Sequence, residues 1–255
     1  MIITSANNIQ IKKVINLKQK SKFRKENALF VVEGIKMFVE IPKEDLVETY
    51  VSESFIENHK SDLEDISYAI VSDSVFKKIS DTVTPQGILA VVKQKKYTVN
   101  DILDARKDKS CIVVLDRLQD PGNLGTILRT GEGAGITGLI MSADCADIYN
   151  PKVIRSTMGS IFRVPFATVS DLPQAIDKLK ESGVTTYAAH LKGSVYSNEP
   201  FAKDCAFLIG NESKGLSDEV SQKADKLIKI PMAGKVESLN AAIATSILMY
   251  KHAEK

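Results

Sequence analysis

The 255-residue sequence lacks the segments that would place a protein in a membrane or direct it out of the cell. No uninterrupted apolar run approaches the roughly 18 residues that a membrane-spanning helix requires. Residues 1–10 do not show the charged-then-apolar pattern of a signal peptide. We therefore expect a cytoplasmic protein that makes no contact with a membrane.

Cysteine is also scarce. Cys111, Cys145 and Cys205 lie far apart in the sequence, and none belongs to a C-x-x-C pair. An odd number of separated cysteines indicates neither a disulfide framework nor a zinc site. Lone cysteines are far more often small buried apolar residues than nucleophiles. We expect all three to be structural, and we expect no metal centre.

Charge is nearly balanced over the whole chain but unevenly distributed. Residues 1–30 hold seven basic side chains against Glu26 alone, which gives +6 there; because the total is +2, the other residues carry −4. Such a segment is typical of an arm that binds a polyanion. A solvated basic helix has the same composition, so charge alone leaves both interpretations open.

Apolar patterning divides the chain into two α/β parts. Short strand-like runs alternate with helical patterns over residues 1–96, which predicts a small α/β domain, and the charged stretch 97–109 is the expected linker. Residues 110–255 alternate strand and helix more regularly. The continuous apolar run at 111–116 is typical of a strand buried on both faces of a parallel sheet. We expect right-handed crossovers between its strands.

A first polar cluster follows the strand at 111–116. Asn123 lies in the segment DPGNLG, at the carboxyl end of that strand, where open α/β sheets bind ligands. Its simplest role is to cap the next helix, worth about 1 kcal/mol. Arg129 comes six residues later, so the two side chains would be about 120° apart on a helix and could border one cleft.

A glycine cluster comes next. Gly131, Gly133 and Gly135 imitate a dinucleotide-binding loop, but they end a helix and precede a strand, which is the wrong order for that loop. We expect them to terminate the helix and to allow close packing.

Two further loops carry polar residues after apolar strands. Gly210 and Gly215 flank Glu212, and glycine lets backbone approach a ligand closely, so Glu212 is a candidate to hold a basic group in place. Ser238 or Asn240 could cap the last helix. That helix begins with a run of small residues, which indicates tight packing against it.

Four segments occur in the order and with the spacing of one enzyme family, across about residues 111–252. They are DPGNLGTILRT, NPKVIRSTMGSIFRVPF, FLIGNESKGLS and IPMAGKVESLNAAIATSILMY. Together they resemble the successive motifs of the SpoU (TrmH-like) 2′-O-ribose RNA methyltransferases of the SPOUT superfamily. The segment TPQGILAVV at 84–92 resembles the end of the L30e-like substrate-binding domain of the two-domain ribosomal RNA enzymes.

This resemblance implies a fold, an assembly and an activity. The fold would be an L30e-like α/β domain followed by a SPOUT parallel-sheet domain, whose C-terminal segment is threaded through a loop as a deep trefoil knot, a rare exception to ordinary topology. The family enzymes are homodimers that bind S-adenosyl-L-methionine (SAM) in a bent form. The implied reaction is methyl transfer to a ribose 2′-hydroxyl of RNA, with 23S ribosomal RNA as the expected substrate.

The resemblance also implies roles for individual residues at positions that match the family motifs. The catalytic set would be Arg129, Asn123, Glu212, Ser238 and Asn240. The cofactor would be lined by Leu208, Gly210, Ile230, Met232 and Leu239. RNA would be contacted by Lys12, Lys13, Lys20, Lys22, Arg24, Arg129 and Arg155. No metal is implied.

The family's arginine is often described as a base. A guanidinium hardly deprotonates in a protein, so we expect Arg129 to bind the nucleotide phosphate and to stabilise the developing oxyanion instead. Deprotonation would need strong help from a neighbouring phosphate.

Three other functions stay open. The chain could act on transfer RNA, could methylate a base nitrogen, or could be a non-catalytic RNA-binding protein with a retired methyltransferase domain. The presence together of Arg129, Glu212, Ser238 and Asn240 argues against a retired site. The complete motif N-x-G-x-x-x-R favours the ribose over a base.

Overall fold

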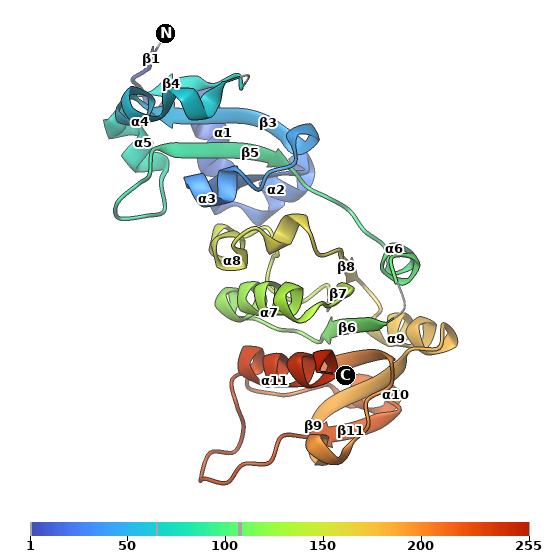
Figure 1. The fold of residues 1–255 in the computed structure, drawn as a ribbon. Helices are drawn as coiled ribbons and strands as arrows, with labels where there is room; N and C mark the ends of the chain where they lie inside the picture. Colours follow the sequence, from blue (N-terminus) through green and yellow to red (C-terminus); the bar gives the residue numbers. More distant parts are fainter. Residues whose placement is uncertain (1, 65, 107–108, 255) are drawn as a thin grey trace. The chain divides into compact units, whose positions relative to one another are not determined.

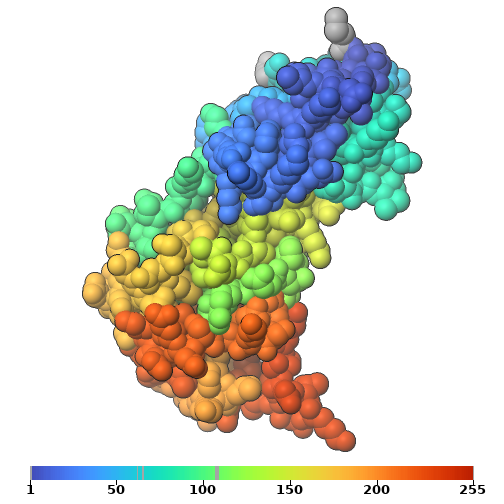
Figure 2. Space-filling view, turned by 180° about the vertical axis from the view of Figure 1, so that it is seen from behind, coloured from blue at the N-terminus to red at the C-terminus, as the bar shows by residue number. Residues whose placement is uncertain are grey.

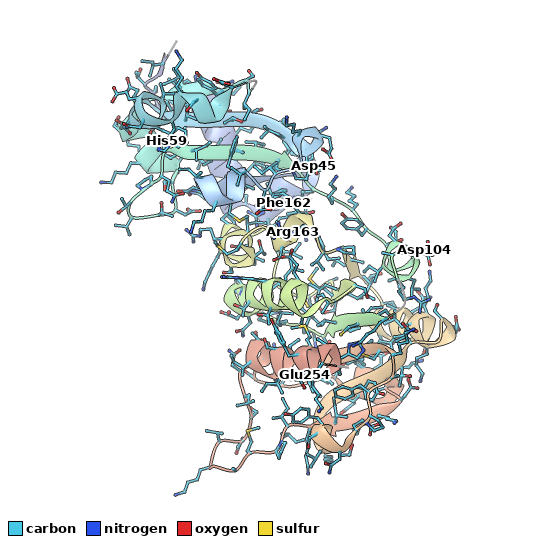
Figure 3. All side chains as sticks on the ribbon, viewed as in Figure 1. Asp45, His59, Asp104, Phe162, Arg163 and Glu254 are labelled. Atoms are coloured by element: carbon cyan, nitrogen blue, oxygen red, sulfur yellow. The ribbon has the colours of Figure 1, made fainter. Side chains whose placement is uncertain are left out.

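The computed structural model describes residues 2–64, 66–106 and 109–254, and the chain divides into two compact units. Unit 1 comprises Met1–Lys95 and Asp147–Phe162, and unit 2 comprises Lys96–Ala146 and Arg163–Lys255. Figure 3 labels Phe162 and Arg163, between which the chain returns from unit 1 to unit 2. The segment 147–162 therefore packs with the N-terminal residues, whereas sequence patterning groups it with the second domain.

Unit 1 is a five-stranded sheet with helices. Its strands are β1 (Ile2–Ile3), β2 (Leu29–Glu33), β3 (Leu46–Ser52), β4 (Ala69–Val71) and β5 (Ile88–Lys93). Its helices are α1 (Ile9–Gln19), α2 (Ser21–Asn27), α3 (Ile35–Phe38), α4 (Glu53–His59), α5 (Asp73–Ile79) and α8 (Pro151–Thr157), with 3-10 turns η1 (Lys43–Asp45), η2 (Lys60–Leu63) and η3 (Ser160–Phe162). The strand order is β1-β4-β3-β5-β2, and β5 runs antiparallel to both of its neighbours.

The basic N-terminal segment is part of this unit's core. Ile11, Val14 and Leu17 recur on one face of α1 and are fully buried, together with Phe76 of α5 and Val31 of β2. The segment is thus a folded basic helix and not a separable arm.

The second face of the sheet explains why α8 belongs to unit 1. Successive residues of a strand point to opposite faces, so Phe30 faces away from the α1 side that Val31 covers. The ring of Phe30 lies 4.7 Å from that of Tyr149 and 6.2 Å from that of Phe162, on either side of α8 in the chain. These contacts require the folded structure and leave no periodic signal in the sequence.

Unit 2 is a six-stranded parallel sheet. Its strands are β6 (Ser110–Leu115), β7 (Gly138–Ser142), β8 (Phe166–Val169), β9 (Thr185–Val195), β10 (Asp204–Ile209) and β11 (Lys226–Lys229). Its helices are α6 (Val99–Asp104), α7 (Pro121–Ala134), α9 (Leu172–Glu181), α10 (Asp218–Lys223) and α11 (Ala241–Ala253), with the turn η4 (Tyr196–Asn198). The order is β11-β9-β10-β6-β7-β8, and each pairing is parallel, which confirms the expected sheet.

The central strands of unit 2 are buried on both faces. Ile112 and Leu208 point into a core formed with α6, α9 and α10. Phe207 points to the other face, where its ring lies 6.4 Å from that of His252 on α11. Helices α7 and α11 lie side by side in Figure 1 and contact one another. Because Leu115 pairs with Ile209, the carboxyl ends of β6 and β10 meet at one edge of the sheet.

The glycine cluster ends α7, as expected. Gly135 has φ +78 and its N–H bonds to the carbonyls of Glu132 and Gly131. The Gly131 carbonyl also accepts from Ile136 N at 2.9 Å, and a Cβ on Gly131 would lie 2.5 Å from the Ile136 side chain. The cluster is a helix stop and not a nucleotide loop.

Among the helices that the structure describes, none is both long enough and apolar enough to cross a bilayer.

Candidate active site at the carboxyl edge of the unit 2 sheet

Three loops of unit 2 are joined by one hydrogen-bond network. Glu212, in the loop after β10, accepts a hydrogen bond from Asn123 Nδ2 at 3.0 Å. Asn123 Oδ1 accepts in turn from Asn240 Nδ2 at 2.9 Å. The three residues follow β10, follow β6 and precede α11, respectively. The structure thus brings together three of the five predicted catalytic residues.

Asn123 is available for this network because another residue caps its helix. Asp120 is the N-cap of α7, and its carboxylate accepts from Asn123 N at 2.7 Å; Pro121 occupies the first helical position. The expectation that Asn123 caps the helix is therefore wrong. Asn123 is the third residue of α7. Its side-chain amide donates to Glu212 in one loop and accepts from Asn240 in another.

Glu212 holds the loops together. Its carboxylate also accepts from Asp120 N at 3.1 Å and from Gln119 N at 3.2 Å. Partial burial on its own raises the pKa of Glu212, but the hydrogen bonds from Asn123, Asp120 and Gln119 outweigh it, and the pKa is lowered. An ionised carboxylate near neutral pH positions its donors and is a poor general acid.

Asn240 has a double role. It is the N-cap of α11, accepting from Ala242 N at 2.9 Å and from Ile243 N at 3.3 Å, as one of the two expected capping residues. Its side-chain NH₂ is thereby directed to Asn123. Ser238, the other candidate, is exposed and does not join the network within the described residues.

Arg129 lies on the exposed face of α7, six residues or about 9 Å along the helix from Asn123. Within the described parts of the chain, its guanidinium has no hydrogen bond or ion pair. An exposed guanidinium without a partner can bind an anionic group in bidentate fashion. Arg129 is therefore placed to bind a phosphate or an oxyanion on the surface of α7.

The loop after β10 depends on a glycine. A Cβ on Gly210 would lie 2.1 Å from backbone atoms of Gly215 and Leu216, which no side chain tolerates. The loop is closed by two backbone bonds between Asn211 and Gly215, at 3.0 and 2.9 Å. The close approach expected at Gly210 is therefore to the loop's own backbone.

The residues expected to line SAM fall into two groups. Leu208 is fully buried and faces the α9 side of the core, so its side chain cannot line a site at the loops. Ile230 and Met232 near the start of the segment between β11 and α11, and Leu239 near its end, are half-buried. Figures 1 and 2 show this segment projecting from unit 2.

The same segment fits a cofactor that is bound through backbone groups. Residues 231–239 donate no backbone hydrogen bond to any other main-chain carbonyl that the structure describes. Free N–H and C=O groups beside half-buried apolar side chains suit a ligand with both polar edges and an apolar body. The residues present therefore fit a nucleoside-type group such as SAM.

The basic residues predicted to contact RNA differ in their surroundings in unit 1. Lys12, Lys20 and Lys22 are exposed. Lys13 pairs with Glu48 at 2.6 Å.

Arg24 corrects one expectation. It is 2% exposed, pairs with Asp147 at 2.5 Å and donates to Leu17 O at 2.8 Å. A phosphate could reach this guanidinium only by breaking the ion pair, so we assign Arg24 to the fold of unit 1.

Sequence patterning did not reveal a groove of about 300 Å³ in unit 1. It is lined by residues of three separate segments of the chain: Glu33, Gly34, Lys36, Met37, Thr82, Thr84, Gln86, Arg155 and Met158. Arg155 donates to Asp81 O at 3.1 Å and brings positive charge to this groove. The groove has no motif of its own because its lining comes from separate parts of the sequence.

Two of the three cysteines are buried, as expected, but they also meet in the fold although they are far apart in the sequence. Cys111 and Cys205 pair directly across β6 and β10, and both lie beside His252. Sheet register brings them together, which spacing in the sequence does not indicate.

Comparison with known proteins finds a matching family for each of the two parts of the chain. Residues 110–250 match the SpoU rRNA Methylase family, and residues 8–90 match the MRM3-like substrate binding domain. The 23S rRNA (guanosine(2553)-2′-O)-methyltransferase RlmP of Bacillus subtilis (strain 168) is 34% identical over 253 residues, 97% of each chain.

Two solved structures are similar over nearly the whole chain. An AdoMet-bound rRNA methyltransferase from Sinorhizobium meliloti has a TM-score of 0.88 at 31% identity, covering 100% of this chain and 97% of that one. A putative RNA methyltransferase of the TrmH family from Porphyromonas gingivalis has a TM-score of 0.82 at 30% identity, covering 97% of each. These matches confirm the resemblance of the four segments, and the chain belongs to the SpoU rRNA methylase family.

Proposed function

We propose that this chain is a SAM-dependent methyltransferase that modifies a ribose 2′-hydroxyl of 23S ribosomal RNA. The observation that carries the proposal is the network of Glu212, Asn123 and Asn240, with the unpaired Arg129 on the same helix as Asn123. The similarity to a relative named as a 23S rRNA 2′-O-methyltransferase supports ribosomal RNA as the substrate class. With that substrate, we place the protein in the cytoplasm.

Bound SAM would supply an electrophilic methyl group. The chain would then hold the ribose hydroxyl in line with this methyl group. It would also exclude water, because opposite charges on the oxygen and on the cofactor neutralise each other as the methyl group is transferred. Ile230, Met232 and Leu239 would supply the apolar surface, and the free backbone groups of 231–239 would hold the polar edges of the cofactor.

Arg129 would act on the RNA. A guanidinium remains charged, so it can bind the phosphate beside the target ribose and stabilise the oxyanion that forms as the hydroxyl loses its proton. This assignment gives Arg129 an electrostatic role and leaves the proton to solvent or to the nucleotide phosphate.

The remaining predicted residues would position the loops. Glu212 accepts from the Asn123 side chain and Asn240 donates to it, which would fix the start of α7 and hence the direction of Arg129. Ser238 is exposed in the same loop as Leu239, and we propose that its hydroxyl meets the substrate.

We propose that residues 1–96 form the RNA-binding domain, 97–109 the linker and 110–255 the catalytic domain. The match of residues 8–90 to a substrate binding domain supports the first assignment. Exposed Lys12, Lys20 and Lys22 would meet phosphates and give strong salt dependence.

We further propose that α11 is threaded as a trefoil knot and that the enzyme is a homodimer. The order β11-β9-β10-β6, with α11 returning against β10 and α7, supports the knot. Ile243 and Tyr250 are 50% and 48% exposed and lie seven residues apart on one face of α11. An apolar face of this kind is expected to be covered by a second copy, which sedimentation at several concentrations would detect.

Methyl transfer in vitro tests the function. The purified chain, labelled SAM and unmodified 23S rRNA should yield RNA that carries one labelled 2′-O-methyl nucleotide after digestion. Label on transfer RNA alone, or on a base, would select one of the alternative substrates. SAM binding without transfer to any RNA would favour the retired enzyme.

A further inference from the structure

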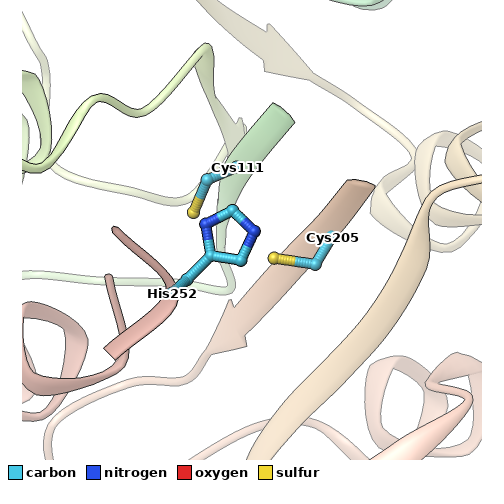
Figure 4. A group of neighbouring side chains, drawn as sticks. All are labelled: Cys111, Cys205 and His252. Atoms are coloured by element: carbon cyan, nitrogen blue, oxygen red, sulfur yellow. The ribbon is translucent and has the colours of Figure 1, made fainter. Parts of the chain in front are cut away.

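Two cysteines and the last histidine of the chain meet in unit 2, away from the Asn123 network. Cys111 and Cys205 are the second residues of β6 and β10 and pair directly in the sheet, whereas the network lies beyond the carboxyl ends of these strands. His252 belongs to the last turn of α11. Figure 4 shows the three side chains directed toward one another.

The cluster has the composition and size of a metal site. The three residues are 3%, 0% and 3% exposed, and their donor atoms all lie within 4.8 Å of one another. Around a tetrahedral zinc ion, with Zn–S about 2.3 Å and Zn–N about 2.0 Å, neighbouring donor atoms are about 3.5 to 3.8 Å apart. Side-chain movements of about 1 Å would therefore close this cluster around an ion.

The imidazole of His252 is held by a main-chain carbonyl, as the imidazoles of metal ligands commonly are. Its Nε2 lies 3.1 Å from Lys203 O. A carbonyl oxygen only accepts, so Nε2 is the donor in this hydrogen bond, which leaves Nδ1 as the nitrogen that would bind an ion. A hydrogen bond from the second ring nitrogen to a main-chain carbonyl is the usual support of a histidine ligand. Lys109 Nζ, 2.5 Å from His252 O, fixes the same turn of the helix.

We propose that Cys111, Cys205 and His252 bind one Zn²⁺ ion, which fastens the last turn of α11 to the amino ends of β6 and β10. Binding breaks two S–H bonds, forms two S–Zn bonds and one N–Zn bond from His252, and releases two protons to solvent. Two thiolates neutralise the dication, which suits a buried site, and soft sulfur donors select Zn²⁺ over Mg²⁺ or Ca²⁺. A solvent molecule would complete four-coordination.

The ion would stabilise the fold, with one coordination position left to solvent by its three protein ligands. The opposite end of α11 begins at Asn240, which bonds to Asn123. Fastening the last turn therefore holds the whole helix that carries one partner of the network, without touching the reacting groups.

Cobalt binding tests the proposal on the full chain, stripped of metal by a chelator under reducing conditions. The wild-type protein should bind one Co²⁺ per chain with a thiolate-to-cobalt charge-transfer band, and Zn²⁺ should displace it. Cys111→Ser, Cys205→Ser and His252→Gln should each weaken Zn²⁺ binding by at least about 100-fold. Cys145→Ser is the matched control, because Cys145 lies outside the cluster and its thiol donates to Leu115 O at 3.4 Å.

Thermal melting provides a second readout. Zn²⁺ at about 100 times its Kd should raise the Tm of the wild type and of Cys145→Ser by about 5 to 10 °C, and should leave the cluster variants unchanged. Failure of the reduced wild type to take up Co²⁺ or Zn²⁺ would overturn the proposal, as would equal uptake by Cys111→Ser. If a cluster variant does not fold, the wild-type cobalt spectrum still decides. A Cys111–Cys205 disulfide in place of metal uptake would identify a thiol pair instead.

Discussion

Asn123 Oδ1 accepts a hydrogen bond from Asn240 Nδ2 at 2.9 Å, which joins the first turn of α7 to the residue that caps α11. The two residues are 117 positions apart in the sequence. Each of the two side chains makes a further hydrogen bond. Asn123 Nδ2 donates to Glu212, and Asn240 Oδ1 accepts from Ala242 N. The bond between Asn123 and Asn240 adds to the packing of α7, which carries Arg129, against α11 at the end of the chain.

Arg129→Ala is expected to lower methyl transfer by about 10²- to 10³-fold, the usual effect of removing one group that stabilises an oxyanion. SAM affinity should stay within about two-fold, because Arg129 is assigned to the RNA. Single-turnover rates and calorimetry measure the two effects. Lys192→Ala, which removes an exposed charge from β9, is the control. A variant that loses SAM binding as well would contradict this division of roles.

Asn123→Asp should disrupt the network, because it places a second carboxylate against Glu212, whose nearest oxygen is 3.0 Å from the present amide. We expect loss of activity and a lower Tm. Adding Glu212→Gln restores a donor opposite the new carboxylate, so the double variant should recover part of both. The coupling free energy should be about 0.5 to 3 kcal/mol. Strict additivity of the two substitutions would show that the residues do not interact.

Stability should depend on pH through Glu212. The pKa of Glu212 is lowered in the folded chain by its hydrogen bonds, against the effect of burial, so the ionised form stabilises the fold. This contribution is complete above the ordinary pKa of 4.5 and is lost as the pH falls through the lower folded value. The Tm difference between wild type and Glu212→Gln should therefore be constant above about pH 5.5 and shrink below pH 4.5. A difference that grew on acidification would have the wrong sign.

Gly210→Ala should destabilise unit 2 by about 3 kcal/mol or more, because the added Cβ would lie 2.1 Å from the backbone of Gly215 and Leu216. Gly234→Ala is the matched control in another loop of the same unit, since its Cβ would meet nothing within 4 Å. Urea unfolding measures both. Equal stability of the two variants would show that the loop after β10 relaxes freely.

The exposed and buried basic residues of unit 1 should behave differently. Changing Lys12, Lys20 and Lys22 together to alanine should weaken RNA binding and reduce the slope of log K against log salt by up to about 2 to 3, with no change in Tm. Arg24→Ala should instead lower the free energy of unfolding by about 3 to 5 kcal/mol, because it leaves Asp147 without its ion-pair partner. An unchanged salt slope in the triple variant would show that these lysines of α1 and α2 do not contact the RNA.

Local patterns predicted most of the fold. The run at 111–116 behaved as a doubly buried strand because both of its faces are covered by helices. The two-residue β1 and the polar α10 are too short to show a period, so local patterns do not predict them. Strand β9 continues to Val195 through a bulge in its pairing with β11, which an apolar run in the sequence does not mark.

The family motifs in the sequence predicted which residues belong to the site, but not which residues each of them contacts. Asn123 carries a capping signal in the sequence, yet Asp120, three residues earlier, takes the cap. Arg24 looks like any other basic residue of its segment until Asp147 is brought beside it. Cys111 and Cys205 are neighbours only through the register of two parallel strands. Each of these outcomes depends on contacts between distant parts of the chain, which composition and spacing do not contain.

The most direct test of the central claim is a map of 2′-O-methyl nucleotides in RNA from cells with and without this gene. The proposed function predicts that one 2′-O-methyl position in 23S rRNA disappears with the gene and returns with the wild-type chain, but not with Arg129→Ala. An unchanged set of 2′-O-methyl positions in all RNA, with SAM still bound by the purified chain, would contradict it.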